Sequence, residues 1–164
     1  FLRKEADYII DTTSLLTREL KAELDKIFLG GEAYNNFIIN IVSFGFKYGI
    51  PRDADLVFDV RFLPNPYYDL NLRPLTGNDE AIQNFVMQHD EAKEFLNKIT
   101  DLLEFLIPNY IAEGKNGLVV AVGCTGGKHR SVTLANGIYQ ELKNMPYSVK
   151  IDHRDIEKDS MRKG

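Results

Sequence analysis

The chain has 164 residues, 44% of them hydrophobic, and a formal net charge of −4, values that suit one globular domain or one domain with part of another. No apolar run is long enough to cross a bilayer and no signal peptide is recognisable, so we expect no membrane partner. The single cysteine excludes an internal disulfide framework and favours a cytoplasmic location.

The first predicted elements are a short strand and a helix. Ala6–Asp11 is typical of a strand, and Thr12 or Thr13 is expected to cap a helix that runs to Phe28 with apolar residues every three or four positions. Because a single β-α unit cannot form a parallel sheet, we interpret this unit as part of a neighbouring domain.

Two further strands are expected. Phe37–Phe44 has the continuous apolar pattern of a buried strand, and Asp55–Phe62 alternates apolar with polar residues. We interpret the latter as a central strand whose second face carries Asp59 and Arg61. These two side chains either orient ligand hydroxyls or pair with each other. Pro64-Asn65-Pro66 ends the strand.

Two helices follow that loop. Asn78 is expected to cap a short helix to about Gln88, and Asp90 to cap the longest helix of the chain. Its apolar stripe continues to Tyr110, although Pro108 should kink or shorten it.

The pattern of the last third of the chain predicts a strand, a loop, a helix and a second strand. The strands are expected at Leu118–Val122 and Ser148–Asp152, and the helix at Ser131–Lys143. Strands separated by helical stretches predict an α/β fold, with a layered and mostly parallel sheet flanked by helices.

Gly123–Ser131, between that strand and helix, is predicted to bind phosphate. A helix N-terminus offers unpaired N–H groups and a positive dipole end. Gly126 and Gly127 allow the backbone to curl around an oxyanion, and Lys128 and Arg130 add positive charge.

The spacing of this loop also permits a second interpretation. It is not a Walker A motif, but its C-x-x-G-x-x-R-S pattern, from Cys124 to Ser131, resembles the loop of protein tyrosine phosphatases over eight residues. There a thiolate attacks phosphorus while the arginine, here Arg130, holds the phosphate oxygens. Gly123 replaces the usual histidine, and Asp69 is the one general acid that we could propose. Otherwise Cys124 is a buried thiol without a catalytic role.

Several longer motifs occur in one order along the chain. They are Ser43–Pro51, Asp59–Pro66, Arg73–Gly77, Gly123–Ser131 and His153–Lys158. Together they closely resemble the RapZ/YvcJ family of bacterial P-loop nucleotide-binding proteins, and the likeness extends from the first residue to the last of these motifs.

This resemblance implies a division into two parts. Residues 1–35 would be the last β-α unit and linker of an N-terminal P-loop kinase-like domain. Residues 36–164 would be a C-terminal ligand-sensing domain, similar in fold to a sugar-phosphate-binding subdomain. The full-length protein is expected to bind ATP or GTP with magnesium and to hydrolyse it slowly, whereas this fragment is expected to be non-catalytic and to hold no cofactor.

The resemblance also implies a ligand. In the RapZ branch the C-terminal domain senses glucosamine-6-phosphate, and the phosphate-binding positions carry over to Thr125, Gly126, Gly127 and Arg130. That branch has a histidine after Pro-Asn-Pro, where this chain has Tyr67, which forms hydrogen bonds but carries no charge.

The candidate ligand-binding residues come from the phosphate loop and from the ends of two other strands. We expect His129 to line the site from an exposed turn and Asn65 to hold a turn or contact the ligand, while His153 and Arg154 serve either the site or an internal salt bridge. The full set is Asp59, Arg61, Asn65, Tyr67, Cys124, Thr125, Gly126, Gly127, Lys128, His129, Arg130, Ser131, His153 and Arg154. No spacing predicts a metal site.

Partners are also implied by the resemblance. The RapZ branch binds small RNAs and acts as an RNase adapter that controls amino-sugar synthesis, so RNA, a regulatory protein and a second copy of the chain are expected partners. From residue 128 to the end, Lys and Arg outnumber Asp and Glu, which suits phosphate or RNA contact. The residues considered for RNA are Lys128, Arg130, Lys150, Arg154, Arg162 and Lys163.

Overall fold

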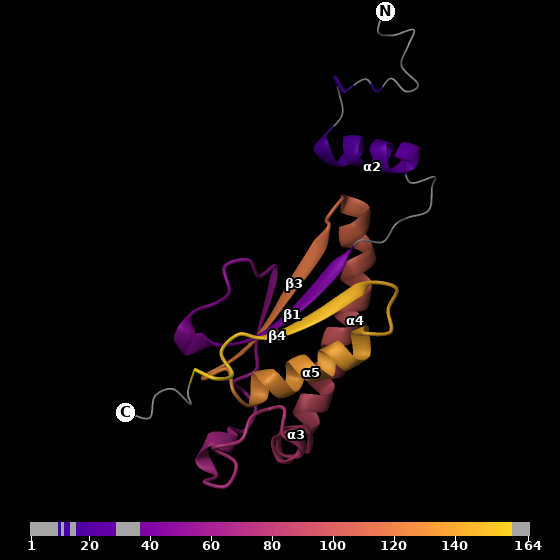
Figure 1. Cartoon of the computed structure of the whole chain (residues 1–164). Coiled ribbons are helices and arrows are strands. Elements are labelled where there is room, and N and C mark those ends of the chain that lie inside the picture. Colours follow the sequence, from indigo (N-terminus) through magenta and orange to yellow (C-terminus); the bar gives the residue numbers. More distant parts are fainter. Residues whose placement is uncertain (1–9, 11, 14–15, 29–36, 159–164) are drawn as a thin grey trace, which may run out of the picture.

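A four-stranded parallel sheet forms the centre of the fold. The computed structural model describes residues 10, 12–13, 16–28 and 37–158. The strands are β1 (Ile38–Gly45), β2 (Leu56–Asp59), β3 (Gly117–Cys124) and β4 (Ser148–His153). Their order is β2-β3-β1-β4, and all three neighbouring pairs are parallel (Figure 1). The predicted α/β class is therefore confirmed.

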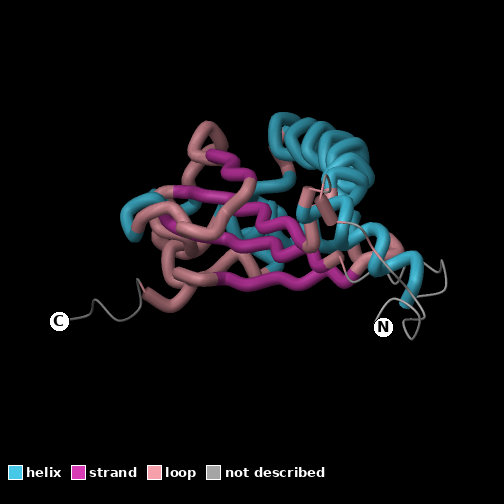
Figure 2. Tube along the Cα trace, turned by 90° about the horizontal axis from the view of Figure 1, so that it is seen from above, coloured by secondary structure: helices cyan, strands magenta, loops and turns pink. Residues whose placement is uncertain are grey.

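Helices pack on the sheet and on one another. They are α2 (Thr17–Phe28), α3 (Glu80–Met87), α4 (Asp90–Glu113) and α5 (Arg130–Leu142), with short 3₁₀ turns at η1 (Phe46–Tyr48) and η2 (Pro66–Tyr68). Helix α5 contacts β1, β3 and β4, and both α3 and α4 contact α5. Figure 2 shows the strands side by side with helices behind and beside them.

The core lies between the sheet and these helices. Alternate residues of β1 and β3 point into it, so Ile39, Ile41 and Val120 are fully buried. Leu134 and Ile138, one helical turn apart on α5, are equally buried and belong to the same apolar cluster. This packing fixes the end of β3 relative to the start of α5.

The strand predictions were accurate for β1, β3 and β4 but wrong for β2. The segment predicted as a long central strand is an edge strand of four residues. It ends early because the Asp59 carboxylate accepts the backbone N–H of Arg61 at 2.9 Å, which turns the chain. As a result Phe62, the last residue of the predicted strand, is 57% exposed.

The helix boundaries differ from the predictions at three points. Asp79, not Asn78, immediately precedes α3, and its carboxylate accepts hydrogen bonds from the N–H and hydroxyl of Thr76. His89 precedes α4, so Asp90 is its first residue rather than its cap. Pro108 does not end α4, which continues to its C-cap glycine.

The N-terminal prediction is only partly covered by the structure. The strand expected at Ala6–Asp11 and the linker near residue 35 lie outside the described residues, apart from Ile10. Helix α2 is present but begins at Thr17, later than the predicted cap. Arg18 of α2 forms an ion pair of 2.8 Å with Glu113 at the end of α4.

The carboxyl ends of the strands meet at one edge of the sheet. Gly45 of β1 is in register with Cys124 of β3, and Asp59 of β2 with Gly123. His153, the last residue of β4, is in register with Ser43. The loops after these strands therefore gather at the edge where open α/β sheets bind ligands.

Candidate functional site

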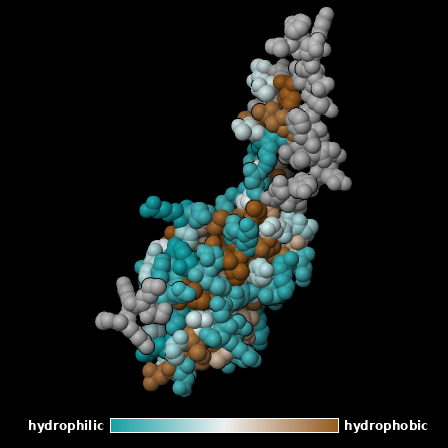
Figure 3. Space-filling model, viewed as in Figure 1, coloured by the Kyte–Doolittle hydropathy of each residue, from teal (hydrophilic) through white to brown (hydrophobic). Residues whose placement is uncertain are grey.

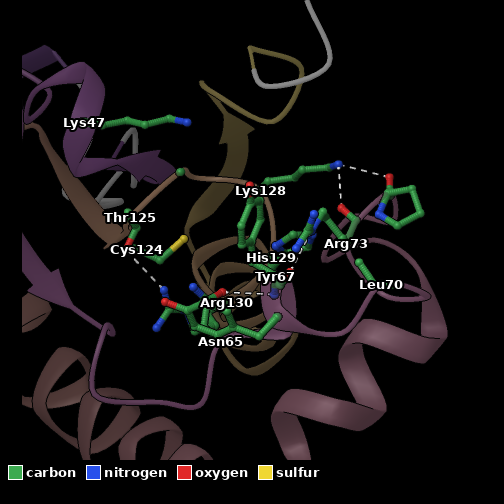
Figure 4. Close-up of a pocket in the computed structure, with 13 residues that line it drawn as sticks. Lys47, Asn65, Tyr67, Leu70, Arg73, Cys124, Thr125, Lys128, His129 and Arg130 are labelled. Carbon is green, nitrogen blue, oxygen red and sulfur yellow. Dashed lines mark hydrogen bonds between the residues drawn. The ribbon is translucent and has the colours of Figure 1, made fainter. Parts of the chain in front are cut away.

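A cavity of about 900 Å³ opens at this edge of the sheet. Three segments form it: the loop after β1, the loop between β2 and α3, and the turn between β3 and α5. Figure 4 shows the side chains that these segments contribute. The lining residues are Lys47, Asn65, Tyr67, Tyr68, Leu70, Arg73, Pro74, Cys124, Thr125, Gly126, Lys128, His129 and Arg130. Eight of the fourteen candidate ligand-binding residues are among them.

The turn between β3 and α5 packs tightly against the end of β1. Gly127 has φ +74°, a conformation that favours glycine, and a Cβ there would lie 2.5 Å from the Gly45 nitrogen. Nearby, two residues after Gly45, the Lys47 N–H donates to the carbonyl of Thr125, two residues before Gly127, at 3.3 Å. Gly127 is thus required by the approach of two backbones and is not itself part of the cavity lining.

A buried carboxylate holds the β1 side of this packing. Asp155, just after β4, is fully buried and accepts the Gly45 N–H at 2.8 Å. It also forms ion pairs with Arg154 and Lys158. Burial by itself raises the pKa of Asp155, but the hydrogen bonds from Arg154, Gly45 and Lys158 outweigh it and hold that pKa below its ordinary value. The sequence analysis gave this residue no role.

The segment from Arg73 to Gly77 forms hydrogen bonds with the same turn, on the side away from β1. The Lys128 ammonium donates to the carbonyls of Arg73 and Pro74 at 3.1 and 3.0 Å, and the His129 ring Nε2 donates to the Leu75 carbonyl at 2.8 Å. The Gly77 N–H donates to the Lys128 carbonyl at 2.8 Å. The turn is therefore fixed in place by protein contacts alone.

His129 is a neutral member of the site. The prediction of an exposed turn was wrong here, because the residue is only 6% exposed. Burial, followed by the nearby charges of Lys128 and Arg130, lowers the pKa of His129 below 6.5, although its bond to Leu75 acts in the opposite direction. The positive charge of the turn at neutral pH comes from Lys128 and Arg130.

Arg130, the first residue of α5, is buried with its guanidinium in a defined orientation. One terminal nitrogen, Nη1, donates to the carbonyls of Arg61 and Leu63 at 3.0 and 2.8 Å, and Nη2 donates to the Thr125 hydroxyl at 3.3 Å. The residue is 4% exposed, and within the described residues no acceptor is within reach of its buried Nε. One edge of the guanidinium is thus committed to the protein, and Nε on the other edge lacks a partner.

Backbone amides of the turn add further donors. Gly127 N–H donates to Cys124 Sγ at 3.3 Å. By contrast, in the part of the chain that the structure describes, no protein acceptor is recorded for the N–H groups of Gly126, Lys128 or Ser131. Since Ser131 lies in the first turn of α5, its N–H has no partner within the helix.

Cys124 lies at the base of the turn in a polar setting. It is 3% exposed, and its Sγ lies 3.1 Å from the Ser131 hydroxyl, in addition to the amide of Gly127. Cys124 also lines the cavity. Figure 4 shows its sulfur near Thr125 and Arg130.

Four predicted residues on neighbouring strands lie outside the cavity lining. Asp59 and Arg61 form a two-pronged ion pair, with Arg61 Nη2 2.6 Å from Asp59 Oδ2, and this pair lowers the pKa of the carboxyl. His153 bonds to Ser43 and to Asn136. Arg154 pairs with the buried carboxylate described above. Asp59, Arg61 and Arg154 thus show the internal pairing that the sequence left as an alternative, whereas His153 bonds to two uncharged side chains rather than in a salt bridge.

The loop between β2 and α3 supplies both predicted and unpredicted lining residues. Asn65 holds a turn, since its side chain accepts the Tyr67 N–H at 3.2 Å, and both residues line the cavity. Asp69 is not among the lining residues. Five lining residues are not among the predicted ones: Lys47, Tyr68, Leu70, Arg73 and Pro74. The Arg-Pro pair that follows the Pro-Asn-Pro turn was the available signal.

The residues considered for RNA do not form one described surface. Lys128, Arg130 and Arg154 donate to acceptors inside the protein, as given above. Lys150 is exposed on the edge strand β4, and the two remaining basic residues, near the C-terminus, lie outside the described residues.

A metal site and a membrane-spanning helix are both absent from the described residues. Among the described residues, no three His, Cys, Asp or Glu side chains are grouped in a way that could hold a metal ion. None of the helices in the same part of the chain is long and apolar enough to span a membrane.

Comparison with known proteins gives one family and many relatives. The RapZ C-terminal domain family matches residues 37–157. A nucleotide-binding protein of Agathobacter rectalis is 63% identical over 163 residues, which cover 99% of this chain and 56% of the relative. Proteins with the same name in Lachnoclostridium phytofermentans and Acetivibrio thermocellus are 61% and 54% identical, over 96% of this chain and 55% and 54% of their own lengths. The chain spans about half the length of these relatives.

Proposed function

Since this chain belongs to the RapZ C-terminal domain family, we propose that its cavity binds a phosphorylated metabolite, such as an amino-sugar phosphate, and that the domain acts as a sensor of that metabolite. The phosphate lies against the turn between β3 and α5. Binding there alters how the domain engages a partner.

The observation that carries this proposal is the unpaired donor set at the start of α5. A buried guanidinium N–H without an acceptor costs free energy, and so does a helix N-terminus whose first amides have none. A phosphate oxygen satisfies both kinds of donor at once, and the helix dipole favours its negative charge. Arg130 Nε and the amides of Gly126, Lys128 and Ser131 are the donors available for this purpose.

The charge of the cavity supports an anionic ligand. Its lining includes Lys47, Arg73, Lys128 and Arg130 and, among the residues that the structure describes, no carboxylate. Because Arg130 is already fixed by Arg61 and Leu63, it loses little side-chain entropy when an anion binds. The amino-sugar part of the proposal rests on the family resemblance, in which Tyr67 stands in place of a ligand-contacting histidine.

The proposal is tested by calorimetry with glucosamine-6-phosphate, and with glucosamine as the control that lacks phosphate. We expect heat of binding for the first ligand only. Arg130→Lys keeps the charge but removes the forked guanidinium, so it should weaken binding at least about tenfold. Arg61→Lys is the matched control, since Arg61 is a nearby but exposed arginine outside the cavity, and it should bind like the wild type. Equal binding of all three proteins, or none by the wild type, contradicts the proposal.

We also propose a function for the rest of the full-length protein. The relatives are named nucleotide-binding proteins, and this chain corresponds to about half of each. We propose that the other half binds ATP or GTP with magnesium, hydrolyses it weakly and responds to the metabolite bound here. Nucleotide hydrolysis by the full-length protein, measured with and without glucosamine-6-phosphate, tests this coupling.

We propose RNA as a further partner of the same domain, as the family resemblance implies. Exposed Lys150 and the basic residues beyond the described part, Arg162 and Lys163, are the cations proposed to contact RNA phosphates. Such contacts predict a steep fall of affinity with salt. Gel shifts at increasing salt test this; binding that is absent or indifferent to salt argues against it.

A cysteine-dependent phosphatase is the second candidate function. It is favoured by the hydrogen bonds that Cys124 Sγ receives from the Gly127 amide and shares with the Ser131 hydroxyl, since both stabilise a thiolate. The thiolate would form an S–P bond as the ester P–O bond breaks, and water would then release phosphate and regenerate the thiol. Turnover of p-nitrophenyl phosphate should then vanish in Cys124→Ser; equal background rates in both proteins eliminate this function.

A further inference from the structure

The cavity has two chemically different ends. Figure 4 places Cys124, Thr125 and Arg130 together at one end, and Arg73 and Leu70 at the opposite end. The first end holds the phosphate donors described above. The proposed function gives the second end no phosphate donor, although both ends belong to the same cavity.

The second end is aromatic and apolar, and it faces solvent. Tyr68 and Leu70 are 81% and 75% exposed, and Tyr67 is 49% exposed. Figure 3 shows hydrophobic side chains at the projecting tip of the molecule, where Figure 1 places the loop between η2 and α3. Large apolar side chains that gather at the mouth of a cavity, rather than singly on the surface, are typical of a binding site.

The aromatic group at this end is held in position. The Arg73 guanidinium stacks over the Tyr67 ring at 4.3 Å from its centroid, and its Nε donates to the Tyr67 carbonyl at 2.9 Å. Tyr68 meets the same ring edge-on, with 6.1 Å between the centroids. Because the two tyrosine rings are nearly perpendicular, a flat ring can stack on only one of them. The Tyr67 ring, which Arg73 holds in place, is the preformed platform for it.

The size of the cavity exceeds what a single sugar phosphate needs. Its volume of about 900 Å³ is near the upper end of the roughly 300–1,000 Å³ that is usual for pockets of drug-sized ligands. A monosaccharide phosphate that reaches from Arg130 to Tyr67 would fill only part of this volume. A ligand that fills the cavity carries a further group, and a planar group can stack on the Tyr67 ring.

We propose that the ligand of this cavity is a nucleotide, with its phosphate at Arg130 and its base stacked on the platform formed by the Tyr67 ring, which Arg73 and Tyr68 support. This inference rests on the proposed function, in which the Arg130 end binds phosphate, and adds the class of the ligand. Stacking recognises every base through its π-face, so the platform selects nucleotides as a class rather than one base. A nucleotide sugar fits the same description, since its base and phosphate occupy the two ends and its sugar the space between.

The experiment compares ligands that differ only in the base. Calorimetry of this chain with AMP, GMP, CMP and UMP is set against ribose-5-phosphate, which keeps the sugar and phosphate and lacks the base. We expect at least one mononucleotide to bind about tenfold or more tightly than ribose-5-phosphate. Because the chain contains no Walker A motif, such binding is not attributable to a P-loop.

Substitutions at Tyr67 and Arg130 separate the two ends. Tyr67→Ala keeps the backbone contacts of residue 67 and should weaken the binding of every mononucleotide much more than the binding of ribose-5-phosphate, so that the advantage of the base is lost. Tyr67→Phe keeps the ring and should retain the advantage. Arg130→Lys should weaken both classes of ligand by a similar factor.

The outcomes distinguish this inference from the proposed function. If ribose-5-phosphate and glucosamine-6-phosphate bind as tightly as every mononucleotide, the nucleotide inference is wrong and phosphate binding stands. Loss of affinity for ribose-5-phosphate and for nucleotides alike in Tyr67→Ala also overturns the inference, because the ring would then contact the sugar. If no phosphorylated probe binds, both the inference and the proposed function fail.

Discussion

Arg130 Nη1 donates to the carbonyl oxygen of Leu63 at 2.8 Å, which ties the first residue of α5 to the loop after β2. The same nitrogen serves the Arg61 carbonyl. Two segments that are far apart in the sequence are therefore joined by one cation in the wall of the cavity. Arg130 thus has a structural role in addition to the binding role proposed for it.

Replacement of Arg130 by alanine should lower the stability of the domain as well as its affinity. It leaves the carbonyls of Arg61 and Leu63 without their donor, which should cost about 2 kcal/mol or more in the free energy of unfolding. Urea unfolding measures this loss. Arg61→Ala removes an exposed ion pair with Asp59 and a cation–π contact with the Phe46 ring, and should cost about 1 kcal/mol. Similar stabilities of the two variants would contradict the structural role of Arg130.

Gly127→Ala should be much more damaging than Gly49→Ala. Both glycines have positive φ, +74° and +85°, so alanine should cost each about 1–3 kcal/mol in backbone strain. At Gly127 the new Cβ would also lie 2.5 Å from the Gly45 nitrogen, whereas at Gly49 nothing lies within 4 Å. Thermal unfolding should therefore show a loss of roughly 3 kcal/mol or more at Gly127; equal losses would mean that the close approach of the two backbones is not formed.

Asp155→Asn should destabilise the protein by about 1–3 kcal/mol, since the charged acceptor of the Gly45 amide and of two cations is removed. The affinity for phosphorylated ligands should fall together with the stability, because Gly45 packs against the turn between β3 and α5.

Stability should also depend on acid pH through Asp155. Its folded pKa lies below the ordinary 3.8, so its contribution is complete above that value and is lost as the pH falls through the lowered pKa. Denaturant unfolding between pH 2 and 6 should show this loss in the wild type and a smaller slope in Asp155→Asn. Parallel curves for the two proteins would rule out the lowered pKa.

His129 and His153 should both titrate below pH 6.5 in the folded protein. Burial is the first cause in each case, because it disfavours the charged imidazolium. Both residues bind protons more readily in the unfolded chain, so their contribution to stability is present above pH 6.5 and declines as the pH falls below it. Imidazole proton resonances, followed by NMR from pH 8 to 4.5 and assigned with His129→Gln and His153→Gln, measure the midpoints. A midpoint at or above 6.5 for either residue contradicts its burial.

The sequence predicted the parts of the site that depend on local pattern. The β-branched run before Cys124, the two glycines and the amphipathic helix after Arg130 identify strand, turn and helix without tertiary information. The partners of the charged side chains could not be predicted from local sequence in the same way. Whether Asp59 and Arg154 face a ligand or an internal partner depends on strand order and on the turn at Arg61, and the same alternation suits an edge or a central strand.

The part of the cavity formed by the loop between β2 and α3 could not be predicted either, because its position also depends on tertiary contacts. Tyr68, Leu70 and Arg73 belong to a loop without periodicity, and their position depends on contacts of Lys128 and His129 with that loop. Asp155 looked like one surface acid in a charged segment, because nothing local indicates that it reaches the Gly45 amide. Long-range backbone contacts of this kind leave little trace in the composition of a segment.

The most direct test of phosphate binding is a ¹⁵N–¹H correlation spectrum recorded during titration with glucosamine-6-phosphate. The account predicts that the largest shifts occur at the backbone amides of Gly126, Lys128 and Ser131 and at the Nε of Arg130, and that glucosamine leaves all four unchanged. Saturating shifts confined to another part of the domain, or none at these four groups, would contradict it.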